Sequence, residues 1–260
     1  MTGTDRENIY RESGDCQTRH RARGRIGISQ PSVSNWTHVA AERVVAVEAA
    51  TGVTCAALRP DLCSDLNTTG LDDVDLMRAH AYALLGSLLQ RAPDADLLSR
   101  LAQLRGDASP LGLALTEIAA AAHEASTEGV EREFFALFIG IGRGEIVPYA
   151  SFYLTGFLHE RPLARLRDDL SRLGIDRAEG VAEPEDHAGI LCEIMAGLTS
   201  GELPAPAGSD RLIFEKHMAP WIGRFFADIE AAAAARLYRH VGTFGRLFLQ
   251  IESEAFALAG

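Results

Sequence analysis

The chain has 260 residues, of which 47% are hydrophobic and 7% aromatic, and its formal net charge at pH 7 is −11. This composition is ample for a buried core. No uninterrupted apolar run reaches the ~18 residues that a membrane-spanning helix needs, and the polar N-terminus lacks the apolar core of a secretory signal. We therefore expect a cytoplasmic protein without membrane insertion.

The negative charge is unevenly distributed along the chain. Residues 1–65 hold eight arginines and eight acidic residues, whereas the remainder holds 17 basic and 28 acidic residues. The excess of carboxylates therefore lies in the second part. This distribution argues against nucleic-acid binding by that part and favours a positively charged partner.

The cysteines and histidines show no pattern of a metal or redox site. The four cysteines are scattered without a C-x-x-C pair, and the eight histidines lack the spacing of zinc ligands. We expect no disulfide in a reducing compartment, no metal site and no cofactor.

The N-terminal part combines a basic tail with a short helical pattern. Residues 1–25 are polar and arginine-rich, which is typical of a disordered tail. Within residues 26–65, Gly27 marks a turn, Ser29 can cap a helix and Pro31 suits its first position. The sequence of Gly27–Trp36, GISQPSVSNW, resembles the Cro-like, YdaS-type helix-turn-helix family.

The resemblance to the helix-turn-helix family implies contact with DNA. In that family, recognition-helix side chains would face the bases and phosphates. The matching residues here are Gln30, Ser32, Ser34 and Asn35. The preceding segment, QTRHRARGRIGI, carries arginines where the supporting helix needs apolar residues, so the motif is degenerate. Two hypotheses stay open: a DNA-binding regulator with the C-terminal domain as its sensor, and a partly folded remnant.

Residues 66–70 are a polar linker, and the sequence pattern of residues 71–260 is typical of long helices. The first predicted helix spans 73–89, and Pro93 ends it. Its predicted inward stripe is Leu76, Ala79, His80, Ala83, Leu84, Ser87 and Leu88. Asp94 then caps a helix over 95–104, and another helix follows over 110–123.

The stretch Val130–Leu170 contains two helices around a glycine loop. The first helix carries Phe134, Phe135, Leu137 and Phe138. The loop holds three glycines within five residues, Gly140, Gly142 and Gly144, which indicates a backbone that comes unusually close to something. The second helix begins at about Ser151. A further apolar face, Leu163, Leu166, Leu170 and Leu173, leads to a helix end at Gly174.

Three more helices complete the chain. The first is opened by Pro184 and buries Ile190, Leu191, Ile194, Met195 and Leu198. One side of the next carries Phe214, His217, Met218, Trp221, Phe225 and Ile229. The last spans 236–257 with Leu237, Val241, Phe244, Phe248 and Ile251 inward. No strand-like alternation occurs in this part, so the fold class is all-α.

Several separated motifs resemble one family. They are the run Glu133–Phe138 with its glycine loop, the segment Pro148–Tyr153, and Glu-Pro-x-Asp-His at 183–187. Together they resemble the TorD/DmsD/NarJ family of molybdoenzyme chaperones, over about residue 72 to the C-terminus. Gly142–Glu145 and Leu154–Leu163 are most similar to the branch associated with formate dehydrogenases.

The resemblance implies a helical-bundle chaperone of the TorD type. Such a protein would hold a molybdoenzyme catalytic subunit, here a formate dehydrogenase, and its twin-arginine signal peptide during cofactor insertion. It would need a groove with an apolar floor and rim carboxylates that bind arginine. The candidate rim residues are Glu133, Glu145, Glu160, Glu183, Glu185 and Asp186. A monomer and a homodimer both remain open.

Candidate client-binding residues follow from these motifs. They are Tyr82, Glu133, Gly142, Glu145, Pro148, Ser151, Tyr153, Glu183, Pro184, Asp186, His187, His217 and Trp221. Simpler roles compete with binding. Tyr82 suits core packing, and the acidic residues of the Glu183–His187 motif suit the first turn of a helix, where the backbone dipole favours negative charge.

Catalysis is not expected. Adjacent residues on a helix point ~100° apart, so Asp186 cannot orient His187 as a catalytic triad requires. The glycine loop lacks the glycine spacing and the preceding strand of a dinucleotide site. We therefore predict a binding protein and not an enzyme.

Overall fold

A computed structural model of the chain describes residues 73–177 and 183–258. The chain divides into two units between Gly70 and Leu71, and every described residue belongs to the second unit. The predicted basic tail, the helix-turn-helix segment with Gln30, Ser32, Ser34 and Asn35, and the linker lie outside the described residues and stay predictions.

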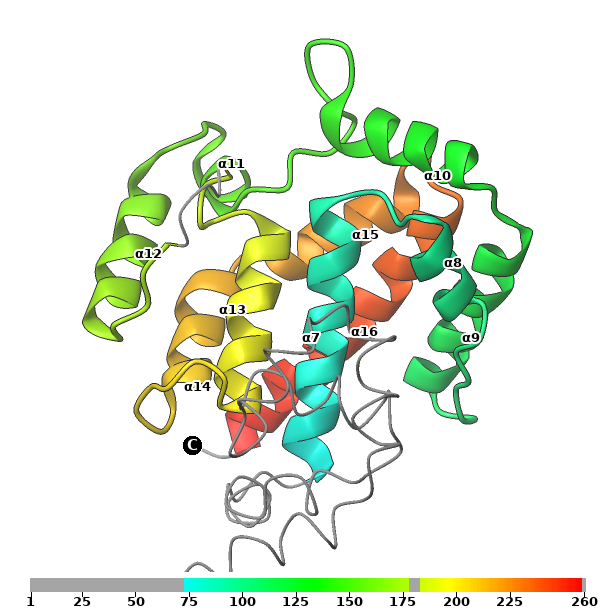
Figure 1. Cartoon of the computed structure of the whole chain (residues 1–260). Helices are drawn as coiled ribbons and strands as arrows, with labels where there is room; N and C mark the ends of the chain where they lie inside the picture. The colour runs from blue at the N-terminus through cyan, green and yellow to red at the C-terminus, as the bar shows by residue number, and fades with distance from the viewer. Residues whose placement is uncertain (1–72, 178–182, 259–260) are drawn as a thin grey trace, which may run out of the picture. The chain divides into compact units, whose positions relative to one another are not determined.

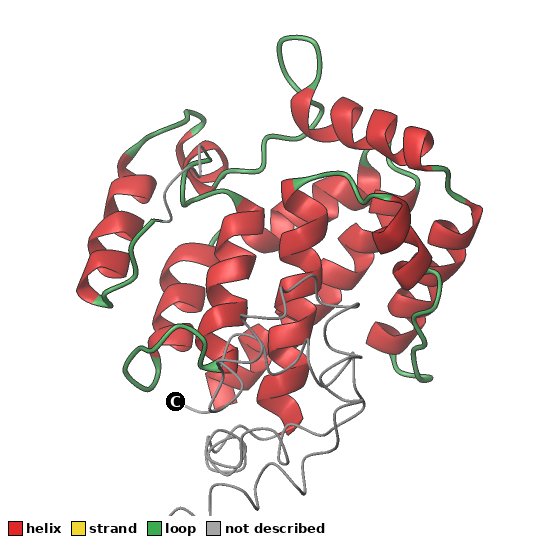
Figure 2. Ribbon diagram, viewed as in Figure 1, coloured by secondary structure: helices red, strands yellow, loops and turns green. Residues whose placement is uncertain are grey.

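Every regular element in the described part is a helix, so the all-α prediction is confirmed (Figure 2). The elements are α7 (Asp73–Gln90), α8 (Ala95–Leu101), α9 (Pro110–Glu124), α10 (Thr127–Phe134), η2 (Phe135–Ile139), α11 (Ala150–Thr155), α12 (Arg161–Arg172), α13 (Ala188–Ser200), α14 (Ser209–Ile213), η3 (Phe214–Met218), α15 (Ile222–Ala231) and α16 (Leu237–Leu258). The elements η2 and η3 are single π-helical turns.

Three helix pairings form the centre of this unit. Helix α7 packs along α13, and α16 packs on α15 and α9, while α12 stands at the edge (Figure 1). At the α7–α13 crossing, a Cβ on Gly86 would lie 3.3 Å from the carbonyl oxygen of Gly189. A larger side chain there would therefore push the two helices apart.

The buried face of α7 differs from the predicted stripe. Ala79 and Leu88 are buried as predicted, but Leu76, His80, Ala83 and Ser87 are exposed. The core instead takes Tyr82, Leu85 and Leu89. Because α7 is apolar around most of its circumference, the side that faces the core is chosen by the helices that pack on it.

The glycine loop approaches its own chain, which confirms the predicted close contact. A Cβ on Gly140 would lie 2.1 Å from the carbonyl oxygen of Arg143, and one on Gly144 would lie 2.5 Å from that of Leu137. Gly140 and Gly142 also have positive φ values of 63° and 89°. The glycines are thus explained by the fold of the loop itself.

The predicted aromatic helix near residue 221 is interrupted. All six predicted inward residues are buried, as expected. They do not lie on one helix, however, because the π-turn η3 ends at Met218, α15 begins at Ile222, and Trp221 lies in the break between them. Trp221 closes the break, since its indole Nε1 donates to the carbonyl oxygen of His217 at 2.8 Å.

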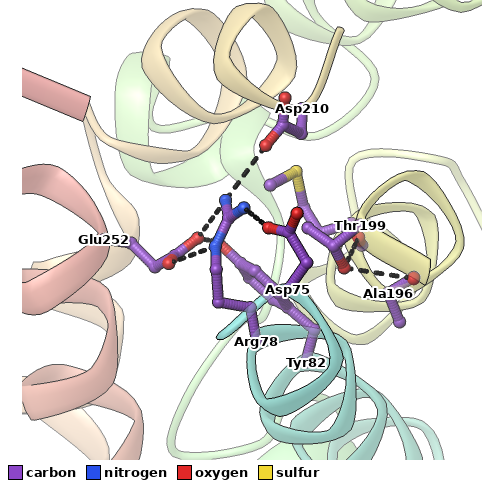
Figure 3. A network of polar contacts seen from close by, with 8 residues as sticks. Asp75, Arg78, Tyr82, Ala196, Thr199, Asp210 and Glu252 are labelled. Carbon is purple, nitrogen blue, oxygen red and sulfur yellow. Dashed lines mark hydrogen bonds and ion pairs between the residues drawn. The ribbon is translucent and has the colours of Figure 1, made fainter. Parts of the chain in front are cut away.

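Helix α16 confirms the last predicted helix but not its whole inward face. Ile251 is 48% exposed, whereas Glu252 is 2% exposed. Glu252 is buried because it receives two bonds from the Arg78 guanidinium, from Nε at 2.7 Å and from Nη2 at 2.9 Å (Figure 3). A hydrophobic pattern cannot anticipate a buried ion pair.

The Arg78 network ties three helices together. Arg78 on α7 also bonds Asp75 at 2.8 Å and Asp210 of α14 at 3.0 Å, and the Tyr82 hydroxyl donates to Glu252 at 2.8 Å (Figure 3). Burial would lower the pKa of Arg78, but the bond and charge of Glu252 outweigh it and raise that pKa. Burial and the same carboxylate raise the pKa of Tyr82. Arg78 therefore stays charged and Tyr82 stays protonated.

We predict that Glu252→Gln destabilises the fold, because it leaves the partly buried Arg78 without its main counter-charge. The expected loss is about 3 kcal/mol in the free energy of unfolding, measured by urea denaturation. Glu254→Gln is the matched control, because Glu254 is exposed on the same helix. A loss below about 1 kcal/mol, as for a surface pair, would contradict the structural role of Glu252.

Candidate functional site

Two family motifs are clasped together by reciprocal backbone bonds. The amide of Ala150 donates to the carbonyl of Asp186 at 2.9 Å, and the amide of Ala188 donates to the carbonyl of Pro148 at 2.8 Å. The Asp186 carboxylate Oδ2 also accepts from the backbone amide of Ser151 at 2.9 Å and from its hydroxyl. These contacts join segments 35 residues apart, and we call them the motif clasp.

The Glu183–His187 motif precedes the helix, which corrects the prediction that Pro184 opens it. Helix α13 begins at Ala188, and His187 is its N-cap, with Nδ1 accepting from the amide of Gly189 at 3.1 Å. Burial lowers the pKa of His187, and the charges of Glu183 and Asp186 offset only part of that effect. The ring is therefore neutral and can accept. Pro184 lies in the preceding turn, where its carbonyl accepts from the amide of His187 at 3.0 Å.

The two glutamates of the motif face other partners. The Tyr149 hydroxyl donates to Glu183 at 2.5 Å, and Arg167 of α12 donates to Glu185 at 2.8 Å. Burial would raise the pKa of Glu185, but the hydrogen bond from Arg167 outweighs it and lowers that pKa. Neither glutamate caps a helix, so the predicted dipole role is wrong for both.

Glu133 and Glu145 accept hydrogen bonds from backbone amides around the junction between α15 and α16. Glu133 Oε1 accepts from the amides of Arg236 at 2.7 Å and Tyr238 at 2.8 Å, at the start of α16. Glu145 accepts from the amide of Ala233 at 2.7 Å. Their carboxylates are therefore occupied by the fold, away from the Glu183–His187 motif.

A groove of about 840 Å³ runs between α7, α12 and α13. Its apolar floor consists of Ala83, Gly86, Leu170, Ile190, Ile194 and Leu203. Ser87 and Ala83 come from the α7 face that the sequence pattern assigned to the core. That face is open because the groove, and not another helix, lies beside it.

The rim of the groove is acidic. Its carboxylates are Asp176, Glu183, Glu185, Glu193 and Glu202, beside two arginines, Arg167 and Arg177. Of the predicted rim residues only Glu183 and Glu185 line it. Asp176 and Glu202 have no ion-pair partner in the described part of the chain. Nothing in the sequence singled these two out, because both are isolated acids in loops that only the fold brings together.

The other predicted site residues are dispersed. Tyr82, Pro148, Trp221 and His217 are buried, and Gly142 lies at the exposed tip of the glycine loop. The half-buried Tyr153 donates through its hydroxyl to Asp228 at 2.7 Å, and burial together with this bond raises its pKa. The structure therefore does not bring these residues together on one surface, and their roles in client binding stay predictions.

A small cavity lies on the other side of α12. It measures about 90 Å³ and is lined by Asp186, Arg165, Lys216, His217 and four apolar residues. Asp186 is 1% exposed, and its Oδ1 is the buried side-chain oxygen without a hydrogen-bond partner in the described part. The cavity therefore offers one free acceptor next to two cations.

The described residues contain neither a metal-binding cluster nor a membrane-spanning helix. Among residues 73–177 and 183–258, no group of three histidine, cysteine, aspartate or glutamate side chains could hold a metal ion. None of the helices in these two ranges is long and apolar enough to cross a membrane.

The described part of the chain is thus an all-helical unit with an acidic groove over an apolar floor. A profile of the family described as nitrate reductase delta subunit matches residues 104–227, which include every predicted client-site residue except Tyr82. A second profile, described as bacterial toxin YdaS, matches residues 22–65, in agreement with the N-terminal resemblance.

Individual relatives agree with the first profile. Chaperone protein TorD from Vibrio cholerae serotype O1, classical Ogawa, is 27% identical over 127 residues, which are 45% of this chain. The El Tor Inaba protein is 26% identical over the same length. The match spans 58% of the length of these curated relatives. These relatives and the first profile support the resemblance of this chain to the TorD/NarJ family.

One solved structure is also similar. It is described as a candidate redox enzyme maturation protein from Archaeoglobus fulgidus, with 24% sequence identity and a TM-score of 0.46. The alignment covers 68% of this chain and 94% of that one.

We predict that Asp186→Ala opens the motif clasp. The buried amide and hydroxyl of Ser151 would lose their acceptor, at a cost of about 2 kcal/mol in the free energy of unfolding. Chemical denaturation measures this loss, and Asp176→Ala, an exposed acid, is the control. An Asp186→Ala protein as stable as the control would show that the clasp does not depend on this carboxylate.

Proposed function

We propose that this protein is a molybdoenzyme chaperone that binds the twin-arginine leader of a catalytic subunit in the groove between α7, α12 and α13. The groove is the observation that supports the proposal. The client is a formate dehydrogenase, because the sequences of Gly142–Glu145 and Leu154–Leu163 resemble the branch associated with these enzymes. The protein acts without catalysis, in the cytoplasm, before cofactor insertion is complete.

The groove matches the two halves of such a leader. Its apolar floor suits the hydrophobic stretch, and a volume of about 840 Å³ is within the usual range of ligand pockets, ~300–1,000 Å³. The carboxylates of Asp176, Glu193 and Glu202 suit the arginines, because guanidinium groups pair with carboxylates in planar, two-point geometry. The excess of acidic residues in this part of the chain steers a cationic peptide toward it.

In the Glu183–His187 motif, buried residues position those that line the groove. Asp186 and His187 are occupied by the clasp and the α13 cap, while Glu183 and Glu185 of the same turn line the groove. We propose that the buried pair positions the two glutamates, and that the glutamates meet the peptide. Loss of Asp186 would then weaken binding indirectly.

Filling the groove is the sharpest test. We predict that Ser87→Leu blocks it without harming the fold, because Ser87 is exposed on α7 and leucine is a good helix former. Titration calorimetry with a formate dehydrogenase leader should give micromolar affinity for the unchanged chain and at least about tenfold weaker binding for this variant.

Two controls make the test specific. Ala120→Leu adds the same bulk on the exposed face of α9, away from the groove, and should bind like the unchanged chain. A leader with both arginines replaced by lysine should bind more weakly, since lysine cannot form the two-point pairing. Equal leader affinity of the Ser87→Leu and Ala120→Leu proteins would refute the groove as the site.

A further inference from the structure

Helix α12, the outer wall of the groove, buries Leu163, Leu166 and Leu170 but makes few close backbone contacts with other helices. It stands at the edge of the described unit, and its close backbone contacts with other helices are chiefly with α11 (Figure 1). Left-handed backbone flanks it on both sides, with φ values of 59° at His159 before the helix and 73° at Gly174 after it. Apolar packing of α12 on the unit is therefore limited to one row of leucines and is not a broad helix–helix interface.

Cavities border α12 on two sides. Arg167 and Leu170 line the groove, whereas Arg165 and Leu166 line the cavity of about 90 Å³. Empty space beside a helix removes the contacts that would fix it in a close-packed interior. Polar contacts must then contribute more to the position of α12.

The main polar contact of α12 is a buried carboxylate. Asp169 is 5% exposed and points to the π-turn η3, where His217 Nε2 lies 2.8 Å from its Oδ2 and the Lys216 ammonium bonds the same oxygen. Arg172, one turn further along α12, donates to its Oδ1 at 2.7 Å. We call the contacts of Asp169 with Lys216 and His217 the α12 latch.

The η3 end of the latch is anchored to the core, and the carboxylate at its α12 end is charged. The carbonyl of His217 accepts from the buried indole of Trp221, so the π-turn is fixed to the core. Burial would raise the pKa of Asp169, but the hydrogen bonds from Lys216 and His217 outweigh it and lower that pKa. The carboxylate is thus ionised at neutral pH, which makes its bonds charge-assisted and strong.

We infer that Asp169 is a positioning residue for peptide binding: through Lys216 and His217 it latches α12 to η3 and so sets the width of the groove. Asp169 does not line the groove, so any effect on the peptide passes through α12. The expected effect of Asp169 on peptide binding rests on the proposed function. The contact between α12 and η3 does not depend on it.

The test compares two neighbouring aspartates. Asp169→Asn removes the negative charge of the latch, and Asp168→Asn removes an exposed charge on the same helix turn. We expect about tenfold weaker leader binding for Asp169→Asn, within the usual range of coupling between sites, and faster amide hydrogen exchange confined to α12. The Asp168→Asn protein should match the unchanged chain in both measurements.

A second variant separates a positioning role of the latch from a loss of stability. Lys216→Gln removes one arm of the latch from a half-exposed position and should shift both measurements in the same direction, by less. A role in stability alone predicts a lower unfolding midpoint with unchanged affinity of the fully folded protein, and that result would overturn the inference.

Two further outcomes separate this inference from the proposed function. Unchanged exchange in α12 of the Asp169→Asn protein would refute the latch. If the unchanged chain binds no leader, the positioning role falls together with the proposed function, and the exchange measurement still decides whether the latch exists.

Discussion

The motif clasp is the constraint on which the site depends. It joins Pro148–Ser151 to Asp186–Ala188 through backbone and carboxylate bonds, and a buried carboxylate that accepts two bonds is costly to disturb. The clasp fixes where α13 begins and where α11 begins. Because Glu183 and Glu185 belong to the clasped turn, it also fixes the part of the groove rim that these glutamates form.

Most of the acidic residues that suggest arginine binding are used by the fold itself. Glu133 and Glu145 cap backbone amides, and Asp186 holds the clasp. The carboxylates left for a partner stand around an apolar floor beside α7, α12 and α13. Under the proposed function, Glu183 and Glu185 of the motif meet the peptide together with rim residues outside it, while Asp186 and His187 supply the scaffold that orients the two glutamates.

The sequence predicted the helices well and the site less well. Capping by Asp94, the helix end at Gly174 and the tight glycine loop follow from local chemistry and agree with the structure. The predicted buried face of α7 was wrong because helix packing selects among several apolar faces. The predicted burial of Ile251 was wrong because the neighbouring Glu252 is buried instead, paired with Arg78, 174 residues away. Asp169, Glu193 and Glu202 gain their roles only from tertiary contacts, which no local pattern encodes.

The central claim is that the leader lies in the groove, and site-specific photo-crosslinking tests it most directly. A photoreactive residue at Ser87, in the groove, should capture the twin-arginine leader, and the same residue at Ala120, on the far side of α9, should not. Capture that competes with unlabelled leader and is lost with the lysine-substituted peptide is the result this account predicts. Specific capture from position 120 with none from position 87 would contradict it.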